Sequence, residues 1–165
     1  MSEQDLAGPA ANGTGSSDQP TVGLVSQYVK DLSFENPGAP AIFQLQGQPQ
    51  IDVQFNIGAA QVGDEVHELV LKIDVKATVE GQVAYVVDLA YAGLFAVQNV
   101  PMEHLQPFML GEAPRLIFPF ARRVIADAVR DGGYPPLMLD PIDFASLYMQ
   151  QIQAQGENGQ PIGNA

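Results

Sequence analysis

Alternating apolar and polar positions predict strands over the first part of the chain. In residues 28–35 one face holds Tyr28, Lys30, Leu32 and Phe34, and the other holds Val29, Asp31, Ser33 and Glu35. This period of two predicts a half-buried strand with an acidic outer face. Residues 51–57 alternate in the same way, and residues 65–79 place apolar side chains at odd positions from Leu69 to Val79.

The segments between these runs predict turns and loops. Asn36 to Pro40 ends the first strand, and a long loop that carries Ile42 and Phe43 runs to Gln50. We expect a turn region over 58–64 and a tight hairpin turn at Glu80-Gly81. Residues 83–97 predict a fourth strand, apolar on both faces and interrupted only by Asp88. Such a strand needs extra cover, which we expect from a partner subunit.

The hydrophobic period becomes helical after residue 100. Residues 101–110 predict a short helix, residues 111–114 a break, and residues 116–130 a longer helix. Pro119 requires the regular helix to begin near it or to kink there. Gly132-Gly133 ends this helix, and an extended linker follows.

The last helix has a clear predicted start. Asp140 is expected to cap it, Pro141 suits its first position, and Asp143 favours the positive helix end. One side of this helix carries Phe144, Leu147, Tyr148 and Ile152. Strands followed by helices predict an α+β fold. We expect a four-stranded, meander-like antiparallel sheet followed by two main helices on one face.

Composition sets the domain limits. Residues 1–21 and 156–165 are rich in small and polar residues and are predicted to be disordered tails around one domain, residues 22–155. The first basic residue is Lys30, and the longest apolar run has nine residues, from Leu89 to Val97. We therefore expect no secretory signal, no direct membrane insertion and a cytoplasmic location.

The charge is scarce and one-sided. The chain has 165 residues, of which 7 are Lys or Arg and 19 are Asp or Glu, for a net charge of −12. This balance disfavours nucleic acid and anionic lipid as partners. The chain has no Cys, which excludes disulfides and thiolate chemistry.

No catalytic pattern is evident. His67 and His104 are the only histidines, and nothing around them resembles a nucleophile elbow. The carboxylates are scattered, so an enzyme that uses them is only a distant alternative. We expect a binding protein with no enzymatic activity, no cofactor and no metal.

Three motifs in order resemble the SecB family of bacterial protein-export chaperones. They are residues 28–37 (YVKDLSFENP), 116–122 (LIFPFAR) and 133–144 (GYPPLMLDPIDF). The resemblance covers roughly residues 22–152. It implies a homotetramer built as a dimer of dimers that binds unfolded precursor proteins and delivers them to the SecA motor. A related chaperone that serves another system, such as an antitoxin, without binding SecA, is the alternative.

The resemblance also implies two sets of site residues. For SecA docking on the outer face of the sheet, these are Asp31, Glu35, Val86 and Asp88. For the client groove, these are Ile42, Phe43, Tyr85, Phe120, Phe144 and Tyr148. Within the groove set we expect partial exposure for Phe43 and Tyr148, and a core position for Phe120 and Phe144.

Overall fold

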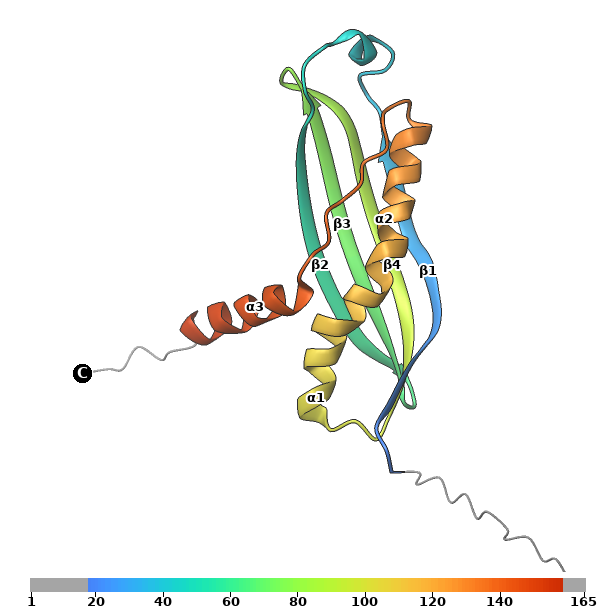
Figure 1. Cartoon of the computed structure of the whole chain (residues 1–165), viewed down its shortest axis with the longest axis vertical. Helices are drawn as coiled ribbons and strands as arrows, with labels where there is room; N and C mark the ends of the chain where they lie inside the picture. The colour runs from blue at the N-terminus through green and yellow to red at the C-terminus, as the bar shows by residue number, and fades with distance from the viewer. Residues whose placement is uncertain (1–17, 159–165) are drawn as a thin grey trace, which may run out of the picture.

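A four-stranded antiparallel sheet with helices on one face forms the fold, in a computed structural model that describes residues 18–158 (Figure 1). The strands are β1 (Thr21–Glu35), β2 (Gln50–Gly63), β3 (Val66–Val79) and β4 (Gln82–Gln98). The predicted α+β architecture is therefore confirmed.

The order of the strands departs from a simple meander. Hairpins join β2, β3 and β4, but β1 lies beside β4, so the order is β1-β4-β3-β2. This is the Greek-key order, in which a long connection carries the chain across the end of the sheet. The connection is residues 36–49 and includes a 3₁₀ turn, η1 (Ala41–Gln44). As a result β1 and β2 are the two edge strands of the sheet.

Both edge strands are longer than predicted. β1 begins at Thr21, seven residues before Tyr28, and pairs with β4 along its length. The turn predicted over 58–64 is wrong, because β2 continues to Gly63 opposite β3. The small side chains of residues 58–60 give a weak pattern, and pairing with the strongly apolar β3 determines their conformation.

The alternation within β1 is also interrupted. Its register with β4 shifts between Leu24 and Ser26, and again between Val29 and Asp31. The second shift makes Lys30 the extra residue of a β-bulge. Tyr28 and Lys30 therefore lie on the outer face, rather than on the side of Leu32 and Phe34 as predicted. The carboxylates of Asp31 and Glu35 remain on the outer face.

The helical part is more continuous than predicted. α1 (Met102–Pro107) leads into a π-helical turn, η2 (Phe108–Glu112), and then into α2 (Ala113–Asp131). The predicted break at residues 111–114 is wrong. Pro114 lies at the start of α2, where a missing N–H is tolerated, and the wide turn before it keeps the chain helical.

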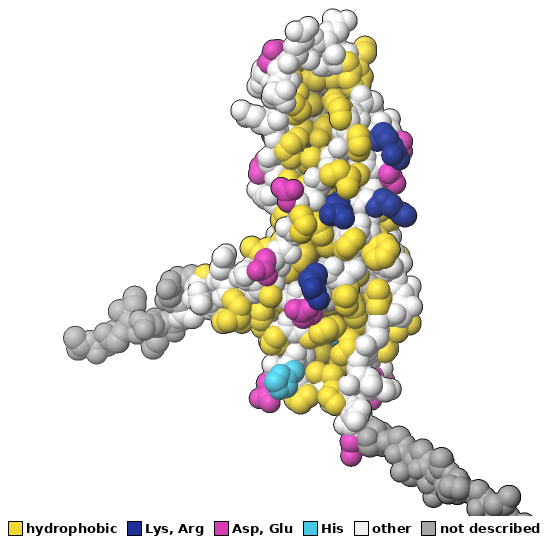
Figure 2. All heavy atoms as spheres, viewed as in Figure 1, with side chains coloured by type: hydrophobic (Ala, Val, Ile, Leu, Met, Phe, Trp, Pro, Cys, Tyr) yellow, Lys and Arg dark blue, Asp and Glu magenta, His cyan; other side chains and the backbone are white. Residues whose placement is uncertain are grey.

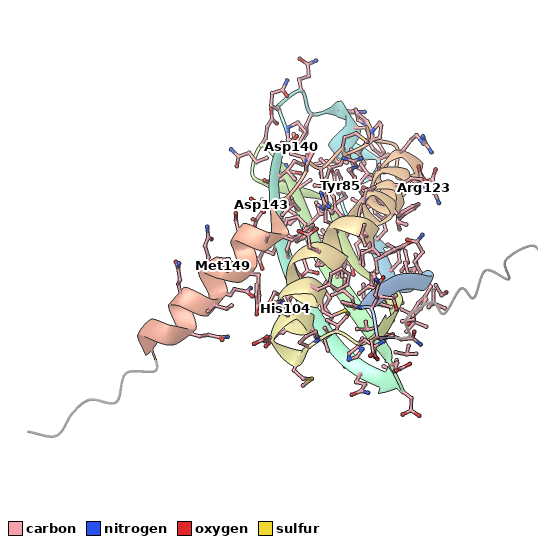
Figure 3. All side chains as sticks on the ribbon, turned by 60° about the horizontal axis from the view of Figure 1, so that its bottom comes forward. Tyr85, His104, Arg123, Asp140, Asp143 and Met149 are labelled. Carbon is pink, nitrogen blue, oxygen red and sulfur yellow. The ribbon has the colours of Figure 1, made fainter. Side chains whose placement is uncertain are left out.

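The last helix, α3 (Phe144–Asn158), begins later than predicted. Asp143, and not Asp140, caps it: the Asp143 carboxylate accepts bonds from the Ser146 N–H at 3.1 Å and the Ser146 hydroxyl at 2.6 Å. Pro141 belongs to the extended linker that crosses the sheet before α3 (Figures 1 and 3).

The core lies between the sheet and α2. Odd-numbered residues of β3 from Leu69 to Val79 are buried there, together with the inward side chains of β4 and the inner stripe of α2. Apolar side chains also reach the surface over much of this face (Figure 2). The predicted tails fall mostly outside the described residues. Where they are described, Thr21 belongs to β1 and residues 156–158 belong to α3.

Candidate functional sites

Four carboxylates meet on the outer face of the sheet. The register places Ser33 opposite Asp88 and Asp88 opposite Asp74, so a lateral row runs from β1 through β4 to β3. Asp31 and Glu35 lie on either side of Ser33 on the same face. Asp31, Glu35 and Asp88 are exposed and Val86 is half-buried, so the four predicted docking residues share one surface.

Asp74 is the acid that the sequence analysis did not assign to this surface. Like charges directly opposite each other in a sheet repel. Partial burial at the middle of the sheet, then Asp74, then Glu35 and Asp31 raise the pKa of Asp88. None of the ion pairs among residues 18–158 involves these four acids. We name Asp31, Glu35, Asp74 and Asp88 the acidic face.

A polar cluster borders the acidic face at the β1 bulge. Glu68 of β3 accepts a hydrogen bond from the Tyr28 hydroxyl and an ion-paired hydrogen bond of 2.7 Å from Lys30 Nζ. These contacts lower the pKa of Glu68, Lys30 contributing most, and they raise the pKa of Tyr28. The cluster reaches across the outer side of β4.

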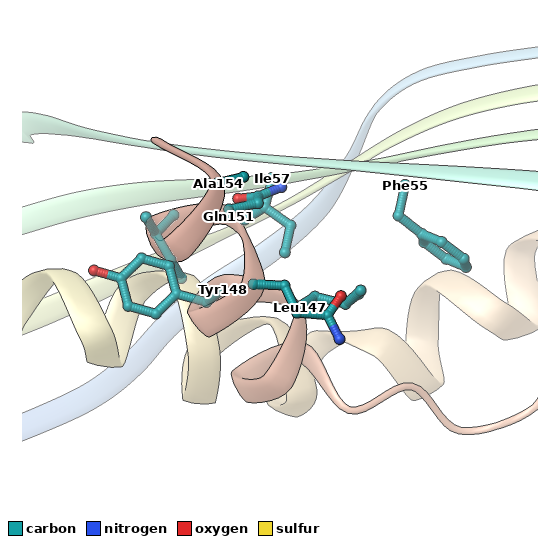
Figure 4. A pocket seen from close by; sticks show the side chains of 8 residues that line it. Phe55, Ile57, Leu147, Tyr148, Gln151 and Ala154 are labelled. Carbon is teal, nitrogen blue, oxygen red and sulfur yellow. The ribbon is translucent and has the colours of Figure 1, made fainter. Parts of the chain in front are cut away.

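The opposite face of the sheet carries a series of hollows along β2. The first lies between β2 and the linker and is lined by Ile51, Val53, Phe55 and residues 137–142. The second lies under α3 and includes Phe55, Ile57, Leu147 and Tyr148 (Figure 4). The third lies toward α1 and includes Ile57, His67 and Met102. Since neighbouring hollows share Phe55 or Ile57, they form one mostly apolar groove, which we name the β2 groove.

Contacts of Tyr134 fasten the start of the linker to the sheet. The Tyr134 hydroxyl donates to Asn36 Oδ1 at 2.6 Å, and it also lies 3.0 Å from the Ala84 carbonyl oxygen. Asn36 Nδ2 in turn donates to the Gly132 carbonyl at 2.9 Å. The Tyr134 ring packs against Tyr85 and Phe43, with centroids 4.8 and 5.2 Å away. The linker is thus fastened to the sheet before it runs along β2.

The predicted groove residues divide into exposed and buried groups. Phe43 is 47% exposed and Tyr148 is half-buried, as expected. Phe120 is 43% exposed, so the core position expected for it is wrong; it lies on the outer side of α2. The buried group comprises Ile42, Tyr85 and Phe144. These three support the groove from the core rather than line it.

Phe144 shows how the core shapes the groove. Its ring packs edge-on against Phe118 and Phe55, with centroids 5.6 and 6.4 Å away. Because Phe144 is the first residue of α3, this contact fixes where the helix leaves the sheet. The sequence analysis missed Phe55, which lines the groove, and Tyr134, which fastens the linker. The alternation of 51–57 and the motif at 133–144 were the available signals.

A further apolar surface lies on the β1 side. Exposed side chains on β1 include Val22, Val25, Val29 and Leu32, and α2 adds Leu116 beside Phe120. A hollow between β1 and α2 is lined by Leu32, Phe34 and Val124 together with Arg123 and Asp127. This apolar surface is separate from the β2 groove, at the other edge of the sheet.

The residues considered for other chemistry are dispersed. His104 is exposed on α1 (Figure 3), whereas His67 lies in β3 with Nδ1 buried and no hydrogen-bond partner. Within residues 18–158, no three His, Cys, Asp or Glu side chains are placed to hold a metal. In the same range, no helix is both long and apolar enough to cross a membrane.

Comparison with known proteins gives consistent results. A family model described as "Preprotein translocase subunit SecB" matches residues 15–155. The chain is 59% identical over 165 residues to "Protein-export protein SecB" of Sphingopyxis alaskensis, covering 98% of this chain and 96% of the relative. It is 58% identical over 167 residues to the protein of the same name from Rhizorhabdus wittichii, covering 100% of both.

A solved structure shares the fold. A SecB-like chaperone of Mycobacterium tuberculosis, in complex with a peptide from an antitoxin, aligns with a TM-score of 0.63. The alignment covers 73% of this chain and 90% of that one, at 15% identity. At this identity the likeness is one of fold alone.

Proposed function

Since this chain belongs to the SecB family and is a chaperone of Sec-dependent protein export, we propose that it binds unfolded precursor proteins along the β2 groove and delivers them to SecA through the acidic face. The observation that carries this proposal is the match of residues 15–155 to the SecB family model, together with 59% identity to a protein-export relative. Binding, rather than the catalysis of a reaction, is the proposed activity, and it requires no metal or cofactor.

The β2 groove suits an extended client. It is mostly apolar, and β2 pairs on one side only, so the backbone groups of its other edge are open to an added strand. Tyr148 in the groove and Phe43, which packs on Tyr134 at the start of the linker, offer aromatic surface with few rotatable bonds. Such surface favours contact without a demand for one sequence. Met138, which lines the first hollow, and Met149 of α3 (Figure 3) add flexible apolar surface; their side chains are 63% and 55% exposed.

The acidic face suits a basic partner. Asp31, Glu35 and Asp88 lie together on the outer face, and the half-buried Val86 supplies an apolar contact among them. Uncompensated acids of this kind attract a segment rich in Lys or Arg, and salt weakens the attraction. We therefore propose that SecA docks here, and that Asp74 takes part with the three acids implied by the family resemblance.

Assembly into a dimer of dimers in the cytoplasm completes the proposal. The β1 and α2 surface leaves apolar side chains such as Val25 and Leu32 in contact with solvent, 65% and 44% exposed. Exposed apolar surface on this scale marks an interaction surface, and a second copy of the chain would cover it.

Native mass and SecA binding test the proposal together. We expect light scattering to give a particle of four subunits and a mixture with SecA to give a heavier complex. Replacing Asp31, Glu35 and Asp88 with Lys should lower SecA affinity by more than about tenfold, because each attraction becomes a repulsion. The matched control replaces Glu65, Glu80 and Glu103 with Lys; these acids lie in the two hairpin turns and on α1.

Client binding is measured separately, as suppression of the aggregation of a slowly folding precursor. The charge-reversed variant should retain this activity, because the β2 groove is on the other side of the sheet. A monomer that ignores unfolded clients would contradict the chaperone assignment. A chaperone that binds clients but not SecA would instead support service to another system, such as an antitoxin.

A further inference from the structure

We propose that Glu68 is a positioning residue that keeps Lys30 away from the acidic face, so that the acids remain available to a basic partner. This inference rests on the proposed function, because it concerns the surface to which SecA is assigned. In β1 the cation Lys30 directly precedes Asp31 on the same face of the sheet, so Lys30 could neutralise an acid of the acidic face.

This position of Lys30 follows from the bulge. In a regular strand Lys30 and Asp31 point to opposite faces. The register shift between Val29 and Asp31 makes Lys30 an extra residue and turns both side chains outward beside Ala90. Asp88 is two residues further along β4, a diagonal neighbour at about 7–8 Å between Cα atoms. A free Lys30 would therefore reach Asp31 or Asp88 and neutralise part of the acidic face.

Glu68 removes this competitor. Lys30 Nζ lies 2.7 Å from Glu68 Oε1, and the Glu68 side chain is only 15% exposed. The Tyr28 hydroxyl holds the second carboxylate oxygen, so the carboxylate is fixed on two sides. With Lys30 drawn over β4 toward Glu68, no ion pair reaches Asp31 or Asp88 within the described part of the chain.

The electrostatic environment of Asp88 agrees with this geometry. The charged neighbours that shift the pKa of Asp88 are Asp74, Glu35 and Asp31, all acidic, and they raise it. Two further cations, Lys72 and Lys76 of β3, lie on this face on either side of Asp74. Lys30 is paired with Glu68, so its charge is offset there rather than by an acid of the acidic face.

A double-mutant cycle tests the proposal. Glu68→Gln should weaken SecA binding about two- to fivefold, since SecA must now break a surface ion pair between Lys30 and an acid. Lys30→Gln alone should change the affinity by less than about 1.5-fold, because Lys30 is already neutralised, whereas adding it to Glu68→Gln should restore most of the loss. Glu65→Gln is the matched control: it also removes one negative charge, but from the turn before β3, where the carboxylate accepts a hydrogen bond from Gln98 and not from Lys30.

Additive effects in this cycle would overturn the proposal, because they would mean that Lys30 and Glu68 act as independent charges. A second readout does not involve SecA. Carboxyl NMR should show a lower pKa for Asp88 in Glu68→Gln than in the unmodified protein, as the released Lys30 approaches. An unchanged Asp88 titration would also overturn it. If the charge-reversed triple variant still binds SecA, the docking assignment fails, but the Asp88 titration still decides whether Glu68 restrains Lys30.

Discussion

Replacing Phe144 with Ala should show that this residue, assigned to the groove by family resemblance, acts from the core. Its side chain is 2% exposed and packs against Phe118 and Phe55. Truncating a buried Phe to Ala costs about 3–5 kcal/mol. Because Phe55 is half-buried and has room to relax, we expect the lower end, about 3 kcal/mol.

Phe43→Ala is the matched control, since it removes the same ring from a surface position. Phe43 is 47% exposed, and burying a whole Phe is worth about 1.5–3 kcal/mol, so the expected loss is about 1 kcal/mol. The measurement is urea unfolding followed by far-ultraviolet circular dichroism, at one protein concentration because the proposed subunit association would contribute to stability. Client affinity should fall in Phe43→Ala.

The comparison has a clear contrary result. If Phe144→Ala lowers the unfolding free energy by less than about 1 kcal/mol, or by less than Phe43→Ala does, Phe144 does not anchor α3 to the sheet. Phe144 would then not belong to the core residues that support the β2 groove.

Three further predictions concern the acidic face, the linker and the α3 cap. The pKa of Asp88 is raised above its ordinary 3.8, so protonated Asp88 stabilises the fold below that value, and this contribution is lost as the pH rises through the raised pKa. Asp88→Asn stays neutral and should therefore raise the melting temperature at pH 7, while it weakens SecA binding. Tyr134→Phe should cost about 1–3 kcal/mol in urea unfolding, since it leaves acceptors at Asn36 and Ala84 without their donor. Hydrogen bonds from Ser146 lower the pKa of Asp143, so the ionised carboxylate stabilises α3, and this contribution is lost as the pH falls through the lowered pKa. The helicity of α3, measured by circular dichroism, should decline over that pH range, and Asp143→Ala should remove this pH dependence.

Periodicity was sufficient for the elements whose environment is uniform. β3 has one buried and one exposed face along its whole length, and its predicted bounds differ from the observed ones by one residue. α2 presents a continuous buried stripe from Ile117 to Val129, so its helical character was also predictable. In both elements the local pattern and the tertiary packing favour the same structure.

The misplaced features depend on contacts distant in sequence. The bulge at Lys30 is visible only from the pairing of β1 with β4 and the bonds to Glu68. The choice between Asp140 and Asp143 as the cap depends on where Phe144 enters the core, because both acids precede an apolar helix. The β1–β4 pairing likewise follows from packing across the sheet. The two strands are not consecutive in sequence, so no turn motif between them predicts that they pair.

The same limitation applies to the candidate sites. Alternation placed Asp31 and Glu35 on one face. Which residues are lateral neighbours depends on the strand register, so the sequence did not show that Asp74 lies opposite Asp88. The groove residues were implied by motif resemblance alone. Motifs do not report exposure, and three of the six residues so implied are buried in the core.

The two proposed surfaces use opposite sides of one sheet, and this has an energetic consequence. On β4, Asp88 points outward while its neighbours Val87 and Leu89 are buried toward the helices. A client in the β2 groove and a basic partner on the acidic face therefore do not compete for the same atoms. In the free protein, burial first and then the neighbouring acids Asp74, Glu35 and Asp31 raise the pKa of Asp88, so its charged form is disfavoured. A cationic segment bound there would stabilise the charged form of Asp88, so an arrangement that is unfavourable in the free protein would favour the proposed complex with a basic partner.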